Sequence, residues 1–208
     1  MEPKVPLGDR KEPAPSGIVN PADGAAEHPA SSAGASGERP ARGERPLLMV
    51  DVDGVISLFS DGWGAGGTGA SQPGSFHSIE GMPHFLSATA ATHLLALAED
   101  FELVWASGWE ERADEHLPHL LGLPQRLPFL RFERAVGRAN AHWKLDAIEA
   151  FAGARPLAWI DDALGSACEE WALARAASTL LVQTDPRQGL TAVEAKRLSD
   201  WARALPGD

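Results

Sequence analysis

The segment that most constrains this chain is an apolar run that ends in two carboxylates, within residues 47–55. Its first residues, Leu-Leu-Met-Val, show no polar alternation, which is typical of a parallel strand buried on both faces of a sheet. Asp51 and Asp53 follow, and Gly54 comes directly after them. Because an unpaired buried carboxylate is costly, we expect a cation near this strand end. In an open parallel sheet, the carboxyl ends of the strands border the ligand crevice.

The same pattern returns further along the chain. Apolar segments at 101–106, 156–160 and 179–183 each precede side chains that carry oxygen. These side chains are Ser107, the pair Asp161 and Asp162, and Thr184 with Asp185. If the strands are parallel neighbours, their polar ends are expected to converge on one site.

Helical patterns separate the predicted strands. They cover residues 87–100, 109–116, 141–151, 166–177 and 191–205. Ser87 and Asn140 are expected to cap the first and third helices, and Pro118 to kink or end the second. Residues 127–132 are predicted to add a short strand. The alternation of strands and helices implies right-handed crossovers, and therefore an α/β fold of three layers, Rossmann-like, with a mainly parallel central sheet.

Composition divides the chain at about residue 46. Residues 1–46 are rich in Pro, Gly, Ala, Ser and Glu and have few large apolar side chains. Such a segment cannot bury enough surface to offset its ordering entropy, so we predict a disordered tail, with a docking segment or a wrongly assigned start as alternatives. Residues 47–208 form the predicted folded domain.

A glycine-rich segment at residues 61–69 does not follow a strand and open a helix, which argues against a dinucleotide-binding loop. We expect a mobile flap over the crevice, in which Trp63 packs as an anchor or stacks on a substrate.

Charge and cysteine content exclude several classes of protein. The formal net charge is -11 at pH 7, of which residues 1–46 contribute -1, so the remainder carries -10 and offers no basic footprint for duplex nucleic acid. Cys168 is the only cysteine, which fits a reducing compartment, and we expect it to be a small buried residue on a helix. No apolar run reaches the roughly 18 residues of a membrane span, and the amino terminus lacks the apolar core of a signal peptide. The expectation is a cytoplasmic protein, and its excess of Arg over Lys suggests a bacterial source.

Two further features point to chemistry at the strand ends. Lys144 falls in the first turn of its predicted helix, where the macrodipole disfavours a cation, and a broken local rule often marks a functional site. Asp161 and Asp162 repel one another unless a cation lies near, and their hard oxygens suit Mg²⁺. Each feature alone has an ordinary alternative: a turn after a strand for Asp51 and Asp53, a solvated lysine, and a helix cap supplied by Asp162.

Taken together, the motifs Asp51-Val-Asp53-Gly54, Ser107, Lys144 and Asp161-Asp162 resemble, in order and context, the four motifs of the haloacid dehalogenase-like (HAD) hydrolase superfamily. The resemblance spans residues 47–183. Within the superfamily, the segments around the motifs resemble a group of small bacterial members. In this superfamily, cap domains are inserted after the first motif or before the lysine. Segments 55–83 and 133–140 are shorter than the roughly 50 residues of a small domain, so no large cap domain is expected.

The resemblance implies a role for each residue. Asp51 would be the nucleophile that forms an aspartyl-phosphate. Asp53 would protonate the leaving oxygen and then activate water. Ser107 and the Gly108 amide would hold phosphate oxygens, and Lys144 would offset negative charge.

The resemblance also implies a metal. Mg²⁺ would bind the Asp51 carboxylate, the Asp53 main-chain carbonyl and Asp161, with Asp162 as a direct or water-mediated ligand. An acid at position 53 is typical of phosphatases and phosphotransferases and is not needed for carbon–halogen cleavage.

The expected function is therefore a Mg²⁺-dependent phosphatase acting on a phosphomonoester, carried by a small molecule or a macromolecule. Two alternatives stay open. One is a catalytically idle module that binds phosphate or metal. The other is a phosphatase of nucleic-acid ends, which the acidic composition disfavours. The substrate and the oligomeric state are not predicted.

Overall fold

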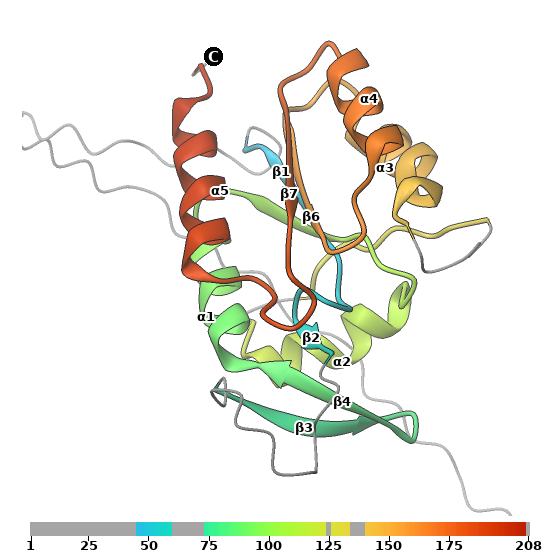
Figure 1. Ribbon diagram of the computed structural model, residues 1–208, viewed down its shortest axis with the longest axis vertical. Coiled ribbons are helices and arrows are strands. Elements are labelled where there is room, and N and C mark those ends of the chain that lie inside the picture. The colour runs from blue at the N-terminus through green and yellow to red at the C-terminus, as the bar shows by residue number, and fades with distance from the viewer. Residues whose placement is uncertain (1–44, 60–72, 124–125, 134–139, 207–208) are drawn as a thin grey trace, which may run out of the picture. The chain divides into compact units, whose positions relative to one another are not determined.

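The computed structural model describes residues 45–59, 73–123, 126–133 and 140–206 (Figure 1). Most of the predicted tail and the whole glycine-rich segment, including Trp63, lie outside the described residues, so the expectations for them stay predictions. Arg45 and Pro46 contact the folded domain: Arg45 Nη1 donates to the Ala98 carbonyl at 2.7 Å, and the Glu102 N–H donates to the Pro46 carbonyl at 3.0 Å. Within the described part of the chain, no helix is long and apolar enough to cross a membrane.

The centre of the fold is a four-stranded parallel sheet in the order β5-β1-β6-β7. Its strands are β1 (Leu47–Val50), β5 (Glu102–Trp105), β6 (Leu157–Asp161) and β7 (Thr179–Gln183). Every residue of β1 is buried, as the unbroken apolar run predicts. The register places Val50 beside Trp105 on one neighbour and Ile160 on the other. The carboxyl ends of β1, β5 and β6 therefore lie together.

Helices cover both faces of this sheet, and successive strand residues alternate between the two sides. The helices are α1 (Ala88–Leu97), α2 (Glu111–Leu121), α3 (Leu145–Ala152), α4 (Ser166–Ala174) and α5 (Ala192–Ala204). Leu48 and Val50 pack in one cluster with residues of α1, α2 and α5. Leu47 and Met49 pack in a second cluster with residues of α3 and α4, including the buried Cys168. Figure 1 shows α1 beside α5, and α3 beside α4 on the other side of the sheet. The predicted three-layer fold is confirmed.

The helix ends show where local capping rules succeed. Ser87 caps α1 as predicted, with its Oγ accepting the Ala90 N–H at 3.1 Å. Asn140 does not cap the third helix. That segment starts as a 3-10 turn, η1 (His142–Lys144), in which the Lys144 N–H donates to the Ala141 carbonyl at 3.0 Å. The Lys144 N–H is thus satisfied by the backbone and not by the Asn140 side chain. Asn140 Oδ1 is buried with no hydrogen-bond partner among the described residues.

Two other sequence expectations need correction. Pro118 does not end the second helix, since it lies buried inside α2, which continues to Leu121; a kink at Pro118 stays a prediction. Residues 127–132 form no strand beside β5, only an isolated parallel bridge between Phe129 and Trp105. Pro128 lacks an N–H and interrupts the ladder.

A small antiparallel sheet, β2-β4-β3, is not predicted from the sequence. It contains β2 (Ser57–Leu58), β3 (Gly74–Ile79) and β4 (Met82–Ser87). The turn between β3 and β4 places Glu80 at φ 50° and Gly81 at φ 80°, as a two-residue hairpin of type I′ requires. The described residues contain no large cap domain, as expected, and this sheet is the element that follows the first motif.

Candidate active site

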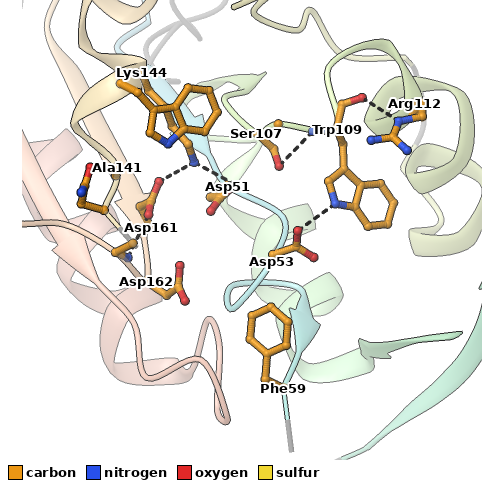
Figure 2. A pocket seen from close by; sticks show the side chains of 14 residues that line it. Asp51, Asp53, Phe59, Ser107, Trp109, Arg112, Ala141, Lys144, Asp161 and Asp162 are labelled. Carbon is orange, nitrogen blue, oxygen red and sulfur yellow. Dashed lines mark hydrogen bonds and ion pairs between the residues drawn. The ribbon is translucent and has the colours of Figure 1, made fainter. Parts of the chain in front are cut away.

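The ends of β1, β5 and β6 border one pocket of about 360 Å³ (Figure 2). A cavity of this size is in the usual range for small-ligand sites. All of the site residues predicted from the sequence line it, namely Asp51, Asp53, Ser107, Gly108, Lys144, Asp161 and Asp162. The pocket therefore brings together side chains from every motif that the resemblance used.

Lys144 joins two of the strand ends. It is the last residue of η1, and its Nζ lies 3.0 Å from Asp51 Oδ1 and 2.7 Å from Asp161 Oδ2. Lys144 is 3% exposed, which is rare for a lysine without paired charges. Burial alone lowers the pKa of this ammonium, but the charges of Asp51 and Asp161 outweigh burial and raise it above its usual value. Lys144 is therefore a fixed positive charge at the bottom of the pocket.

Three carboxylates surround the single positive charge of Lys144. Oxygens of Asp51, Asp161 and Asp162 all lie within 4.8 Å of one another. Burial, reinforced by the charge of Asp51, raises the pKa of Asp161 and that of Asp162 to about 6 each. Asp161 Oδ1 also accepts the Ala163 N–H at 2.9 Å, which fixes its orientation. Crowded hard oxygens of this kind fit a Mg²⁺ ion, which prefers carboxylate and carbonyl ligands.

The residues that follow β7, the fourth strand, support the pocket but do not line it. Thr184 is buried, and its Oγ1 donates to the Gly54 carbonyl at 2.9 Å. Asp185 Oδ1 accepts the Arg187 N–H at 2.9 Å, and this bond lowers the pKa of the Asp185 carboxyl. The expected convergence of all four strand ends is thus wrong for β7. Its polar residues hold the loop after β1 and cap a turn.

Asp53 points across the pocket from this cluster. It is partly exposed, and its Oδ2 accepts a hydrogen bond from Trp109 Nε1 at 3.0 Å. Trp109 itself is only 8% exposed and meets the His84 ring edge-on, with centroids 4.6 Å apart. The sequence places Trp109 only as the start of a helix. Its position two residues after Ser107 at a strand end is the one signal that could have identified it.

Ser107 and Gly108 form the loop between β5 and α2. Ser107 is 2% exposed, and its Oγ is 3.5 Å from the Trp109 amide nitrogen, a long contact. Gly108 is exposed and lines the pocket. Because α2 begins at Glu111, three residues after Gly108, and Arg112 in its first turn lines the pocket, the positive end of its helix dipole lies near the pocket.

Three side chains at the pocket rim were not predicted from the sequence. Phe59 is 50% exposed. Arg112 is ion-paired with Glu80 at 2.7 Å. The ring of Trp143 lies 5.4 Å from the Lys144 ammonium. Arg112 lies on α2 and Trp143 on η1, and only the fold brings these side chains and Phe59 to one pocket.

Comparison with known proteins agrees with this arrangement. A family model described as the HAD domain in Swiss Army Knife RNA repair proteins matches residues 47–195, well over half of the chain, and the match includes every predicted site residue. No curated protein and no solved structure matches the chain. With a parallel α/β sheet, no large cap among the described residues and the motifs of the superfamily gathered at one pocket, the chain belongs to this family of HAD-like hydrolase domains.

Proposed function

We propose that this protein is a Mg²⁺-dependent phosphatase that cleaves a phosphomonoester through an aspartyl-phosphate on Asp51. The observation that carries the proposal is the ion pair of Asp51 with Lys144, 3.0 Å long, at the bottom of a pocket that also holds Asp161 and Asp162. A buried carboxylate fixed by a lysine is a preorganised nucleophile. Family membership supports hydrolase chemistry.

The reaction has two steps. In the first, a carboxylate oxygen of Asp51 forms a bond to phosphorus while the bond from phosphorus to the leaving oxygen breaks, and Asp53 gives that oxygen a proton. In the second, water attacks the phosphorus of the aspartyl-phosphate and gives a proton back to Asp53. Inorganic phosphate leaves, and Asp51 is restored.

Electrostatic support comes from the residues around the nucleophile. Lys144 keeps its charge, because the pKa of its ammonium is raised, and it offsets charge on Asp51 and on the phosphoryl oxygens. Ser107 and the Gly108 amide are proposed to hold two of those oxygens. Both lie at the start of the segment that leads into α2, where an anion is favoured.

The carboxylates of Asp51, Asp161 and Asp162, with the main-chain carbonyl of Asp53, would hold the metal. When bound, Mg²⁺ neutralises phosphate charge and orients the phosphoryl group. The raised pKa of Asp161 and of Asp162 supports this assignment, because a bound cation would offset the burial, and the charge of Asp51, that raise these values.

A terminal phosphate on RNA is the substrate class that we favour within this reaction. The matching family is described by its occurrence in RNA repair proteins. At the pocket rim, Phe59 is half exposed and offers an aromatic face to a base, and the Arg112 side chain, paired with Glu80, is 46% exposed and places a cation near a neighbouring phosphate. The net charge of -11 disfavours binding along a duplex but not capture of an end.

The test is turnover by the purified protein of p-nitrophenyl phosphate and of oligoribonucleotides phosphorylated at the 3′ or the 5′ end. We expect phosphate release with Mg²⁺, suppression by EDTA, and no turnover by Asp51→Asn. RNA is expected to have the higher kcat/KM. Activity that survives in Asp51→Asn would contradict the mechanism. Mg²⁺ binding with no turnover of any of these substrates would favour the idle module instead.

A further inference from the structure

We propose that Trp109 is a positioning residue for the acid–base Asp53, an inference that rests on the function proposed above. The indole Nε1–H of Trp109 donates to Asp53 Oδ2 at 3.0 Å. Figure 2 shows the indole and this carboxyl facing one another at the side of the pocket opposite Lys144. The superfamily motifs do not include this tryptophan.

The chemistry of the hydrogen bond gives it a consequence for catalysis. An indole nitrogen donates but cannot accept, so Asp53 Oδ2 faces Trp109 as an acceptor. Trp109 thus restricts the rotation of the carboxyl group and sets the direction in which it is presented to the pocket. An acid that is held in one orientation loses less entropy when the leaving group departs.

Trp109 is in turn held from the side of the small antiparallel sheet. The ring of His84, on β4, meets the indole edge-on at 4.6 Å. His84 Nδ1 is hydrogen-bonded to Ser57 Oγ at 3.1 Å. Ser57 lies on β2 and forms an isolated bridge with Asp53 itself. Contacts therefore lead from the Asp53 backbone through Ser57 and His84 to Trp109, and Trp109 returns to the Asp53 carboxyl group.

The backbone after Trp109 is also constrained. Glu110 has φ 49°, a left-handed value that costs free energy in a residue other than glycine. Its Oε1 accepts the Phe132 N–H at 3.0 Å, which holds this conformation. Two residues further, Arg112 pairs with Glu80 in the turn between β3 and β4. The small sheet therefore holds the segment that carries Trp109, and through Trp109 it supports the orientation of Asp53.

The variant Trp109→Phe tests the proposal, because it keeps an aromatic ring beside His84 and removes the hydrogen-bond donor. The readout is kcat/KM, which reports the step up to departure of the leaving group. For an alkyl phosphate, whose leaving oxygen needs a proton, we expect a fall of about 10- to 100-fold, less than the roughly 10²–10⁴-fold that general acid–base catalysis supplies, because Asp53 itself is still present. For 2,4-dinitrophenyl phosphate, we expect a change below about 3-fold.

The matched control is Trp201→Phe, on α5, whose ring stacks on Phe101 and does not line the pocket. It is expected to leave both substrates unaffected. A purely structural role for Trp109 predicts equal losses on the two substrates, and equal losses would overturn the proposal.

A second measurement separates this inference from the proposed function and needs no turnover. In the ¹H–¹⁵N spectrum, the Trp109 indole resonance, assigned through its contact with the His84 ring, is expected to move upfield and exchange faster with solvent in Asp53→Ala. Asp185→Ala should leave it unchanged. If the wild type hydrolyses no phosphomonoester, the proposed function fails while this measurement still decides the hydrogen bond. An indole resonance that does not respond to loss of Asp53 would refute the positioning role.

Discussion

Gly54 and Asp162 approach so closely that a Cβ atom at position 54 would lie 2.5 Å from the Asp162 carboxyl carbon. Gly54 also has φ +73°, a conformation that other residues rarely adopt. The glycine that follows these two aspartates, just after β1, is therefore favoured for two reasons: its positive φ, and the Asp162 carboxylate that leaves no room for a side chain. This contact brings the first and last motifs of the superfamily together.

We predict that Gly54→Ala weakens Mg²⁺ binding as well as the fold, because the new methyl group displaces the Asp162 carboxylate. Gly122 is the matched control. It has φ +69° at the end of α2, and nothing lies within 4 Å of a Cβ built there. Gly122→Ala is expected to cost about 1–2 kcal/mol of unfolding free energy from backbone strain alone. Calorimetric Mg²⁺ titration and thermal melts of both variants measure the difference. Equal Mg²⁺ affinity in the two would show that Asp162 is not a ligand.

Lys144→Met is predicted to lower both turnover and stability. Its ammonium is shared by two buried carboxylates, so its loss leaves charges without compensation, at a cost of about 3–5 kcal/mol in metal-free protein. Lys196 is the control, because it is exposed and its ion pair is with Asp200, one helical turn away. Urea melts with and without Mg²⁺ are the measurement. We expect Mg²⁺ to recover part of the stability of Lys144→Met but none of its activity. A variant as stable as Lys196→Met without metal would rule out the buried ion pairs.

The pKa values of Asp161 and Asp162 predict an unusual pH dependence of metal-free stability. Each rises from 3.8 to about 6 on folding, because of burial and the charge of Asp51. From about pH 3.8 until both carboxyls have ionised, above pH 6, the folded state binds more protons than the unfolded state, so stability falls as pH rises. In EDTA, we expect the melting temperature to be higher at pH 5.5 than at pH 7.5. Saturating Mg²⁺ should reverse this trend, since the metal binds the ionised carboxylates.

Asp162→Asn should reduce the fall of the melting temperature between pH 5.5 and pH 7.5 in EDTA. Asp185→Asn is the matched control, since hydrogen bonds from Arg187 lower the pKa of that carboxyl, and its effect on stability falls below pH 3.8, outside the measured range. A melting temperature in EDTA that rises steadily from pH 5.5 to 7.5 would contradict the proposed crowding of charge.

The central sheet and its site were predictable because the same residues determine both. An unbroken apolar run identifies β1 as a buried central strand, and the carboxylate that ends it, Asp51, identifies the pocket edge. The run that ends in Asp161 repeats the signal. Lys144 was predictable as a site residue because a cation is unfavourable in the first turn of a helix, although the segment begins with a 3-10 turn. In each case the information lies in consecutive residues.

The small sheet and the residues that it positions were not predictable in this way. β3 is largely exposed and polar, so it carries no buried apolar run, and its turn at Glu80 and Gly81 is recognised only once both strands are known. The bond between Trp109 and Asp53 joins segments 56 residues apart in the chain. Nothing local distinguishes a tryptophan that begins a helix from one that holds a carboxyl group.

The two aspartates of the first motif should separate the two chemical steps. Asp51 is buried against Lys144, whereas Asp53 lies at the opposite side of the pocket with Trp109, so the nucleophile and the acid occupy different environments. In Asp53→Asn, with an activated substrate such as 2,4-dinitrophenyl phosphate, the leaving group needs no proton and the first step proceeds. Hydrolysis of the aspartyl-phosphate needs a base and is expected to slow by about 10²-fold or more.

The phosphoenzyme should therefore accumulate in Asp53→Asn, visible by mass spectrometry as one added phosphoryl group on the peptide that contains Asp51. The double variant with Asp51→Asn is the control and should show no adduct, because an amide is a poor nucleophile. EDTA should suppress the adduct and Mg²⁺ restore it, which implicates the metal in the first step. A phosphoryl group found on Ser107 or on a histidine would assign the nucleophile elsewhere and overturn the mechanism.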